Sequence, residues 1–138
     1  LKDEFGLTYI FISHDLNVVR FISDRVMVMY LGRVAELGAS EEVFARARHP
    51  YTAALLSSMP SLDPDNRTEV APLAGDPPNP IDPPSGCRFH TRCSFVEPVC
   101  SVTEPPVAPA GPNHLAACLM VQAGSGHSRA PAALEAAA

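Results

Sequence analysis

The sequence predicts an α/β fold followed by a small, loop-rich module that contains four cysteines. Residues 7–13 (LTYIFIS) form an unbroken apolar run, which is typical of a strand buried on both faces of a parallel sheet. Seven of the 15 prolines lie between Pro64 and Pro84, and this shift in composition marks a boundary. All four cysteines follow that boundary.

A polar pair, His14 and Asp15, follows the apolar run and precedes an amphipathic stretch at residues 16–23. Open α/β sheets place ligand chemistry at the carboxyl ends of their strands. Asp15 is suited to cap the next helix, because its carboxylate can accept hydrogen bonds from the free amides of the first turn. We therefore expect His14 at the sheet edge, free to donate to a bound anion; a structural histidine is the alternative. We also expect most of this sheet to lie outside the chain.

A hairpin is predicted next. Residues 25–31 form a second apolar strand, Gly32 and Arg33 supply the turn, and residues 34–37 return along it, ending at Gly38.

Two short helices are expected after the hairpin. Ser40 is a good N-cap for a helix through about Ala47, whose first turn carries acidic residues. Pro50 suits the first position of another helix, because its φ is already helical. The expected buried stripe of that helix consists of Tyr51, Leu55, Leu56 and Met59.

These patterns divide the chain into four parts. Residues 1–60 form the compact α/β part, and residues 61–85 are an extended, proline-rich linker. Residues 86–121 hold the cysteines. Residues 122–138, rich in glycine, serine and alanine, are expected to be disordered.

Composition excludes some classes of function. The net charge of −5 and the absence of tryptophan argue against nucleic-acid binding, which needs a basic face. No apolar run approaches the roughly 20 residues of a membrane-spanning helix.

The four cysteines, Cys87, Cys93, Cys100 and Cys118, follow the spacing C-x5-C-x6-C-x17-C. Structural zinc prefers pairs of ligands separated by two to four residues, so this spacing is a poor match. Two disulfides would suit a small secreted domain. A four-cysteine iron–sulfur cluster tolerates more varied spacing. All three explanations remain open at this point.

The flanking residues favour a metallocluster. The positive charges of Arg88 and Arg92 are expected to lower the thiol pKa values and offset the charge of a thiolate-bound cluster. Gly86 allows a close backbone approach. His90 and His114 are alternative zinc ligands, although a supporting role suits them better.

Residues 8–19 and 23–38 closely resemble the end of the ATPase domain of ABC transporters. The resemblance implies that the α/β part is the C-terminal fragment of a P-loop ABC ATPase domain. It also implies that Ser13, His14 and Asp15 form the switch loop, whose histidine contacts the γ-phosphate of ATP.

A second resemblance is more specific. Four segments occur in the order seen in the C-terminal extension of the ATPase subunits of bacterial oligopeptide/dipeptide importers. They are residues 49–56, 75–80, 83–93 and 114–118. This resemblance implies that Cys87, Cys93, Cys100 and Cys118 bind a [4Fe–4S] cluster, with Zn²⁺ as the alternative and a structural role favoured over redox sensing. Thr91 departs from the family, which commonly has proline there.

The resemblance implies a function for the complete protein. It would hydrolyse ATP with Mg²⁺ to power import of oligopeptides, dipeptides or related solutes such as nickel. Its partners would be a second ATPase subunit, two transmembrane permease subunits and, indirectly, an extracytoplasmic solute-binding protein. It would lie peripherally on the cytoplasmic face of the membrane.

This chain lacks the phosphate-binding G-x-x-x-x-G-K-[ST] loop, the ABC signature and the magnesium-binding Asp-Glu. We therefore expect no ATP hydrolysis by the chain alone. The alternative function is a stand-alone metal-binding (Zn or Fe–S) structural or interaction module without ATPase activity.

Overall fold

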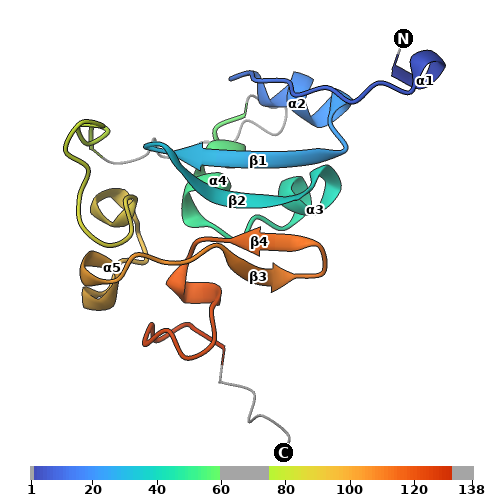
Figure 1. Ribbon diagram of the computed structural model, residues 1–138. Coiled ribbons are helices and arrows are strands. Elements are labelled where there is room, and N and C mark those ends of the chain that lie inside the picture. The colour runs from blue at the N-terminus through green and yellow to red at the C-terminus, as the bar shows by residue number, and fades with distance from the viewer. Residues whose placement is uncertain (1, 60–74, 132–138) are drawn as a thin grey trace, which may run out of the picture.

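The computed structural model describes residues 2–59 and 75–131. Within these ranges a four-stranded antiparallel sheet is bordered by short helices (Figure 1). The helices are α1 (Lys2–Phe5), α2 (Leu16–Ile22), α3 (Ser40–Ala45), α4 (Pro50–Ser57) and α5 (Pro98–Val102), with 3₁₀ turns at His90–Arg92 and Leu119–Val121. The strands are β1 (Arg25–Tyr30), β2 (Arg33–Ala39), β3 (Ala108–Gly111) and β4 (His114–Ala116). None of the helices in these ranges has the length and apolar character needed to cross a membrane.

The sheet joins parts of the chain from both sides of the proline-rich segment. Its strand order is β1-β2-β4-β3, and Leu37 of β2 lies opposite Leu115 of β4. The ATPase-like hairpin and the cysteine-bearing segment are therefore connected by backbone hydrogen bonds. The division of the chain at residues 60 and 85 stays a prediction.

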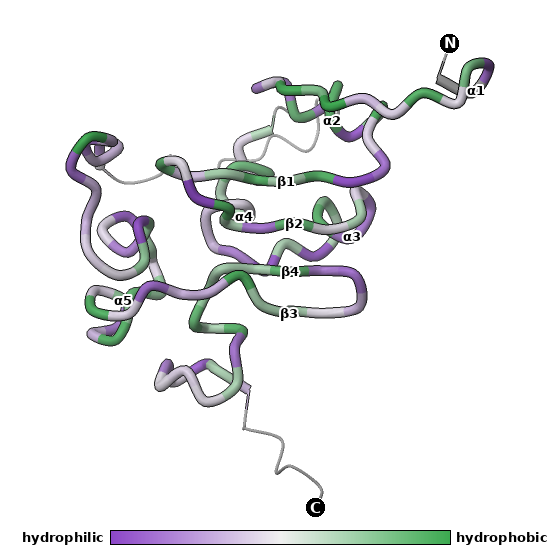
Figure 2. The backbone as a smooth tube through the Cα atoms, in the orientation of Figure 1, coloured by the Kyte–Doolittle hydropathy of each residue, from purple (hydrophilic) through white to green (hydrophobic). Residues whose placement is uncertain are grey.

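The prediction of a buried parallel strand at residues 7–13 is wrong for this structure. These residues contain no strand, and Ile10 and Ile12 are 95% and 92% exposed. Figure 2 shows this largely hydrophobic segment beside α2, beyond the free edge of β1. A strand forms only when a neighbour takes up its backbone hydrogen bonds, and the described residues supply none here. The sheet that the described residues do form is antiparallel, not parallel.

The hairpin β1–β2 is confirmed, with its turn one residue earlier than predicted. Leu31 and Gly32 have φ values of 44° and 75°, and both φ values are positive as in a type I′ turn. Arg33 is already the first residue of β2. The register passes from Met29 opposite Val34 to Val28 opposite Glu36, so Ala35 is the extra residue of a β-bulge. The bulge explains why two successive residues, Ala35 and Glu36, are both buried.

The helix caps follow the predictions in two of three cases. Asp15 caps α2 and accepts hydrogen bonds from two amides of the first turn. Pro50 opens α4 as predicted, and the Nδ1 of His49 accepts the amide of Tyr51. Ser40 does not cap α3: Ala39 occupies the cap position, and the Ser40 hydroxyl is buried without a partner among the described residues. The amide of Ser40 donates to the Asp24 carbonyl, and Ser40 is the first residue of α3.

The predicted buried stripe of α4 is only half-buried. Tyr51 packs against the aromatic core, while the fully buried residues of α4 are Pro50 and Thr52. The helix lies behind β1 and β2 in Figure 1, and its buried residues lie in its first turn.

The regions predicted to be irregular differ from one another. Residues 61–74 of the predicted linker lie outside the described residues, and residues 75–85 contain no helix or strand. Residues 122–131, which we expected to be disordered, form successive turns against the cysteine-bearing segment. Their hydrogen bonds, including Gln122 Nε2 to the Ala116 carbonyl, explain this order. Residues 132–138 lie outside the described residues.

A carboxyl group in the core links three segments. Glu36 is fully buried, and its oxygens accept the amides of Arg48 and His49 at 2.7 and 3.0 Å. Nε2 of His114, on β4, lies 2.5 Å from the Oε1 of Glu36 and donates to it. Gly38 makes room for this ring, because a Cβ there would lie 3.1 Å from the ring of His114.

We predict that Glu36→Gln lowers the free energy of unfolding by about 3 kcal/mol, because the amide cannot accept all three hydrogen bonds and leaves a buried donor unsatisfied. Urea unfolding of the chain measures this. Glu42→Gln, which removes an exposed partner of Arg46, is the control and should change it by less than about 0.5 kcal/mol. Equal effects of the two substitutions would contradict a central role for Glu36.

Candidate four-cysteine site

All four cysteines line one small cavity. Cys87 and Cys93 flank the His90–Arg92 turn, Cys100 lies in α5, and Cys118 follows β4. All four are free thiols, and the cavity has a volume of about 20 Å³. The structure thus brings together every cysteine that the spacing singled out.

Gly86 sets the distance between two of the cysteine-bearing loops. Its φ is +65°, and a Cβ at this position would lie 2.4 Å from the carbonyl oxygen of Cys100. The close approach lets the amide of Cys87 donate to that oxygen at 2.8 Å. The expectation of a tight backbone approach at Gly86 is confirmed.

Three of the sulfurs accept a hydrogen bond from the amide two residues further along. The donors are Phe89 for Cys87, Phe95 for Cys93 and Met120 for Cys118. The amide of Phe95 lies 3.4 Å from the Cys93 sulfur. Such N–H donors stabilise a thiolate and are a feature of metal–sulfur sites. The spacing of the cysteines did not predict these turns.

Burial opposes ionisation of the thiols. It raises the pKa of Cys87 and Cys93, and it raises the pKa of Cys118 to about 12. The prediction that Arg88 and Arg92 lower these pKa values is therefore wrong. Arg88 donates to the Leu31 carbonyl. The charge of Arg92 acts on the Tyr51 hydroxyl, where it only partly offsets the rise in pKa that burial causes. A metal binding here must displace the thiol protons.

The histidines near the cavity already have hydrogen-bond partners. Nδ1 of His90 donates to the Cys87 carbonyl at 2.8 Å, which leaves its other nitrogen available. His114 is bound to Glu36 and does not line the cavity. His127, which the sequence did not single out, does line it, and both of its ring nitrogens are hydrogen-bonded. His90 and His49, which also lines the cavity, each keep one ring nitrogen without a described hydrogen bond, so either could replace a cysteine as a ligand without breaking one.

The thiols do not form a finished coordination sphere. Among the residues that the structure describes, no three His, Cys, Asp or Glu side chains are already arranged to hold a metal ion. The cavity volume is close to that of one water-sized site. The donor set therefore fits a thiolate-bound metal, but the sulfurs must move to receive one.

An aromatic cluster connects this site to the hairpin and α4. Phe89, two residues after Cys87, is 2% exposed and meets Tyr30 edge-on with ring centroids 5.3 Å apart. Tyr51 completes the cluster, 5.4 Å from Phe89 and 4.7 Å from Tyr30. Aromatic pairs at these distances contribute beyond their buried area.

His49 lies between this cluster and Glu36. Burial lowers its pKa from 6.5 to about 4, although the nearby Glu36 opposes the shift. The neutral ring is also what the cap of α4 requires, because Nδ1 must be unprotonated to accept the Tyr51 amide.

His14 lies on the exposed surface at the start of α2. The adjacent Asp15 is held by its capping bonds, and its own amide donates to the Ser13 hydroxyl at 3.0 Å. The local Ser-His-Asp turn is thus ordered with the imidazole facing outward. His14 does not line the cysteine cavity.

The chain is similar to a known family of transport proteins. Residues 35–100 match the family described as the C-terminal region of the oligopeptide/dipeptide transporter. The chain is 49% identical over 121 residues to the dipeptide transport ATP-binding protein DppF of Escherichia coli. It is 50% identical over 120 residues to the oligopeptide transport ATP-binding protein AppF of Bacillus subtilis. The chain belongs to this oligopeptide/dipeptide transporter family.

The match covers most of the chain but a minority of each relative. A putative peptide import ATP-binding protein of Brucella ovis is 53% identical over 86% of the chain and 38% of its own length. The Escherichia coli and Bacillus subtilis proteins match 88% and 86% of the chain, and 36% of their own lengths. The chain thus spans less than two fifths of these oligopeptide/dipeptide transporter proteins. Cys87, Cys93 and Cys100 fall within the family match, whereas His14 and Cys118 lie outside it.

We predict that the free energy of unfolding falls as the pH is lowered from about 6.5 to about 4. In this window the unfolded state binds a proton at His49 that the folded state does not. The full difference amounts to roughly 3 kcal/mol. Urea titrations at several pH values test this. His49→Asn keeps a good N-cap residue and should flatten the dependence in this window; an unchanged slope would exclude His49 as its source.

Proposed function

We propose that this chain is the C-terminal part of the ATP-binding subunit of an ABC importer for oligopeptides or dipeptides. In this proposal His14 contacts the γ-phosphate of ATP, and the four cysteines bind a [4Fe–4S] cluster. The single observation that carries the cluster proposal is the convergence of all four thiols on one cavity. The names and identities of the relatives support the transport proposal.

The exposed apolar residues at the N-terminal end support membership in a larger ATPase domain. Phe5, residues 7–12 and Phe21 are exposed, and β1 has an unpaired edge next to them. Exposed apolar patches of this kind mark interaction surfaces. We infer that the rest of the ATPase domain covers this surface.

His14 would act as a sensor of the terminal phosphate. Its position before a capped helix fixes the backbone while the ring faces outward. A hydrogen bond from imidazole to a phosphate oxygen is charge-assisted and gains strength in a closed, water-poor interface. The complete subunit would bind ATP with Mg²⁺, pair with a second ATPase subunit and drive two permease subunits, with a solute-binding protein delivering the peptide or related solute. It would lie on the cytoplasmic face of the membrane.

The cluster would act as a structural cross-link. Cys87 and Cys93, Cys100, and Cys118 come from three segments with little apolar core between them. When bound, the cluster supplies four metal–thiolate bonds that hold these segments together. The amides of Phe89, Phe95 and Met120 would stabilise the thiolates. A single Zn²⁺ ion, which needs less space, is the alternative occupant.

A stand-alone metal-binding module is the second candidate function. The pairing of β2 with β4 favours it, because it joins the hairpin to the cysteine-bearing segment by backbone hydrogen bonds within the chain. The exposed segment at residues 7–12 counts against it, since an isolated module would leave this apolar surface in water. ATP turnover by the complete protein separates the two functions.

We predict that His14→Ala in the complete subunit lowers ATP turnover by about 10²-fold, because a hydrogen bond to the reacting phosphate is lost. Steady-state phosphate release, with the permease subunits present, measures this. Asn17→Ala, at an exposed position in the first turn of α2, is the control and should leave turnover unchanged. Unaltered turnover in the His14 variant would remove the proposed role.

We predict that the complete subunit, purified without oxygen, contains about four iron atoms and four sulfides bound by this site. Cys100→Ser should abolish or strongly reduce both, while Ser94→Ala, an exposed residue in the same segment, should not. Elemental and sulfide analysis makes the measurement. Stoichiometric zinc without sulfide would replace the cluster by zinc, and the absence of both metals would refute the site.

A further inference from the structure

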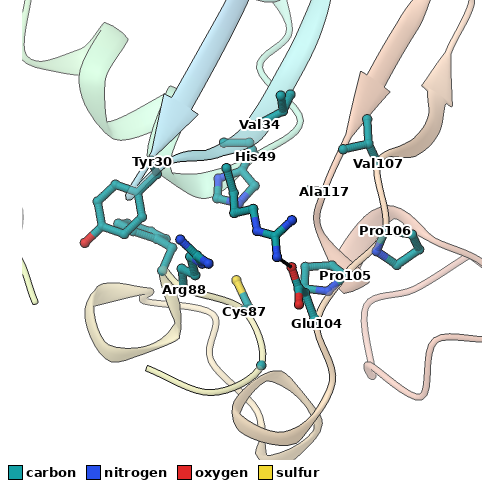
Figure 3. Close-up of a pocket in the computed structure, with 15 residues that line it drawn as sticks. Tyr30, Val34, His49, Cys87, Arg88, Glu104, Pro105, Pro106, Val107 and Ala117 are labelled. Carbon is teal, nitrogen blue, oxygen red and sulfur yellow. Dashed lines mark ion pairs between the residues drawn. The ribbon is translucent and has the colours of Figure 1, made fainter. Parts of the chain in front are cut away.

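A second, larger cavity opens beside the cysteine site. This cleft has a volume of about 530 Å³ and lies between the turn of the β1–β2 hairpin and residues 104–107. Its size falls within the range of pockets that hold small molecules. Figure 3 shows the sulfur of Cys87 pointing into the cleft between Arg88 and Glu104.

Cys87 belongs to the wall between the two cavities. It lines both the cleft and the cysteine cavity, together with His49 and Phe89. Of these three shared residues, Cys87 is the one that the spacing of the cysteines identifies as a metal ligand. A molecule in the cleft would therefore meet the site at this thiol.

Another side of the cysteine cavity is covered by residues 122–131, here named the C-terminal strap. His127 of the strap is buried, lines the cavity and donates to the Phe95 carbonyl at 3.0 Å. Ser128 binds the carboxylate of Glu97, and Arg129 lies over the ring of Phe95, 4.5 Å from its centroid. The strap thus closes the side next to Phe95, whereas the Cys87 side faces the open cleft.

The charge of the cleft selects what can enter it. Arg33 and Arg88 line it, against a single acidic residue, Glu104, in a chain whose net charge is −5. Arg33 and Glu104 form an ion pair at 3.2 Å, but both side chains are more than half exposed. An exposed pair of this kind contributes little and can exchange partners. With its pKa near 4, His49 adds no charge at neutral pH. The cleft therefore favours an anion over a bare metal cation.

We propose that the cleft binds a small anionic carrier of a soft metal ion and that the ion reaches the site at Cys87 first. The proposal rests on the proposed metal site. The carrier's class follows from two observations: the cationic lining, which attracts an anion, and the thiol at the end of the cleft, which takes a soft metal. Transfer exchanges one ligand of the carried ion for the Cys87 sulfur, and the thiol proton is released to solvent.

The test uses the complete subunit in metal-free form. Its cysteines are alkylated under anaerobic conditions with iodoacetate, an anion, or iodoacetamide, which is neutral, and the modified peptides are quantified over time. Zinc uptake from zinc citrate is followed in parallel. Val107→Trp fills the cleft, and Val102→Trp, on the exposed surface of α5, is its control. Arg33→Glu reverses the charge of the cleft, and Arg46→Glu, on an exposed side chain elsewhere, is its control.

We expect Cys87 to be alkylated before the other three cysteines of the site. Val107→Trp should slow its alkylation and the uptake of zinc several-fold, and Val102→Trp should not. Arg33→Glu should slow iodoacetate by about tenfold and leave iodoacetamide nearly unchanged. Glu97→Gln, which weakens the contact between the strap and Glu97, should not change the order in which the cysteines are alkylated.

Earlier modification of Cys93, or equal rates in the Val107 and Val102 variants, would overturn the proposal. So would an equal effect of Arg33→Glu on both reagents. Failure of the metal site itself is recognised separately, because the wild-type subunit would then contain neither iron nor zinc when purified without oxygen and would also take up no zinc. Normal final zinc content with unaltered rates in every variant would sink the cleft proposal alone.

Discussion

The buried carboxyl group of Glu36 is the interaction on which the rest of the structure depends. Its two oxygens bind the amides that precede α4 and the imidazole of His114 on β4, which is 78 residues away in the sequence. A buried carboxylate is tolerated only when its hydrogen bonds are satisfied, so these segments are held in one arrangement. The bulge at Ala35 turns Glu36 inward, and Gly38 leaves space for the ring that meets it.

The contacts around Glu36 determine the position of the cysteine site. The carboxylate places His49 at the start of α4, and α4 brings Tyr51 against Tyr30 and Phe89. Phe89 is fixed in this cluster, which positions the backbone of Cys87 two residues earlier. The strand β4 then leads directly to Cys118. Three of the four sulfurs meet an amide two residues on, so local turns orient the thiols while the core sets their separation.

Local signals in the sequence predicted several elements correctly, whereas predictions that depend on contacts with distant segments failed. Asp15 and Pro50 act within a single helical turn, so their roles could be read from their immediate neighbours. The run at residues 7–13 was interpreted as a strand, but a strand needs a partner, and the described residues provide none. Arg88 is adjacent to Cys87 in sequence, yet its guanidinium reaches the carbonyl of Leu31 on the hairpin. Nearness along the chain was therefore a poor guide to the pKa values of the thiols. Burial raises the pKa of Cys87 although an arginine follows it directly in the sequence.

The sequence by itself determined the family, the set of four cysteines, the hairpin and the position of His14 ahead of a capped helix. These follow from residue type and short spacing, which act over a few residues. Only the tertiary structure decided that β2 pairs with β4, that Glu36 and His114 meet in the core, and that Cys87 stands between two cavities. The same holds for the strap at residues 122–131, whose composition indicated disorder. Contacts between distant segments depend on the mutual fit of whole surfaces, and no local pattern in the chain encodes that fit.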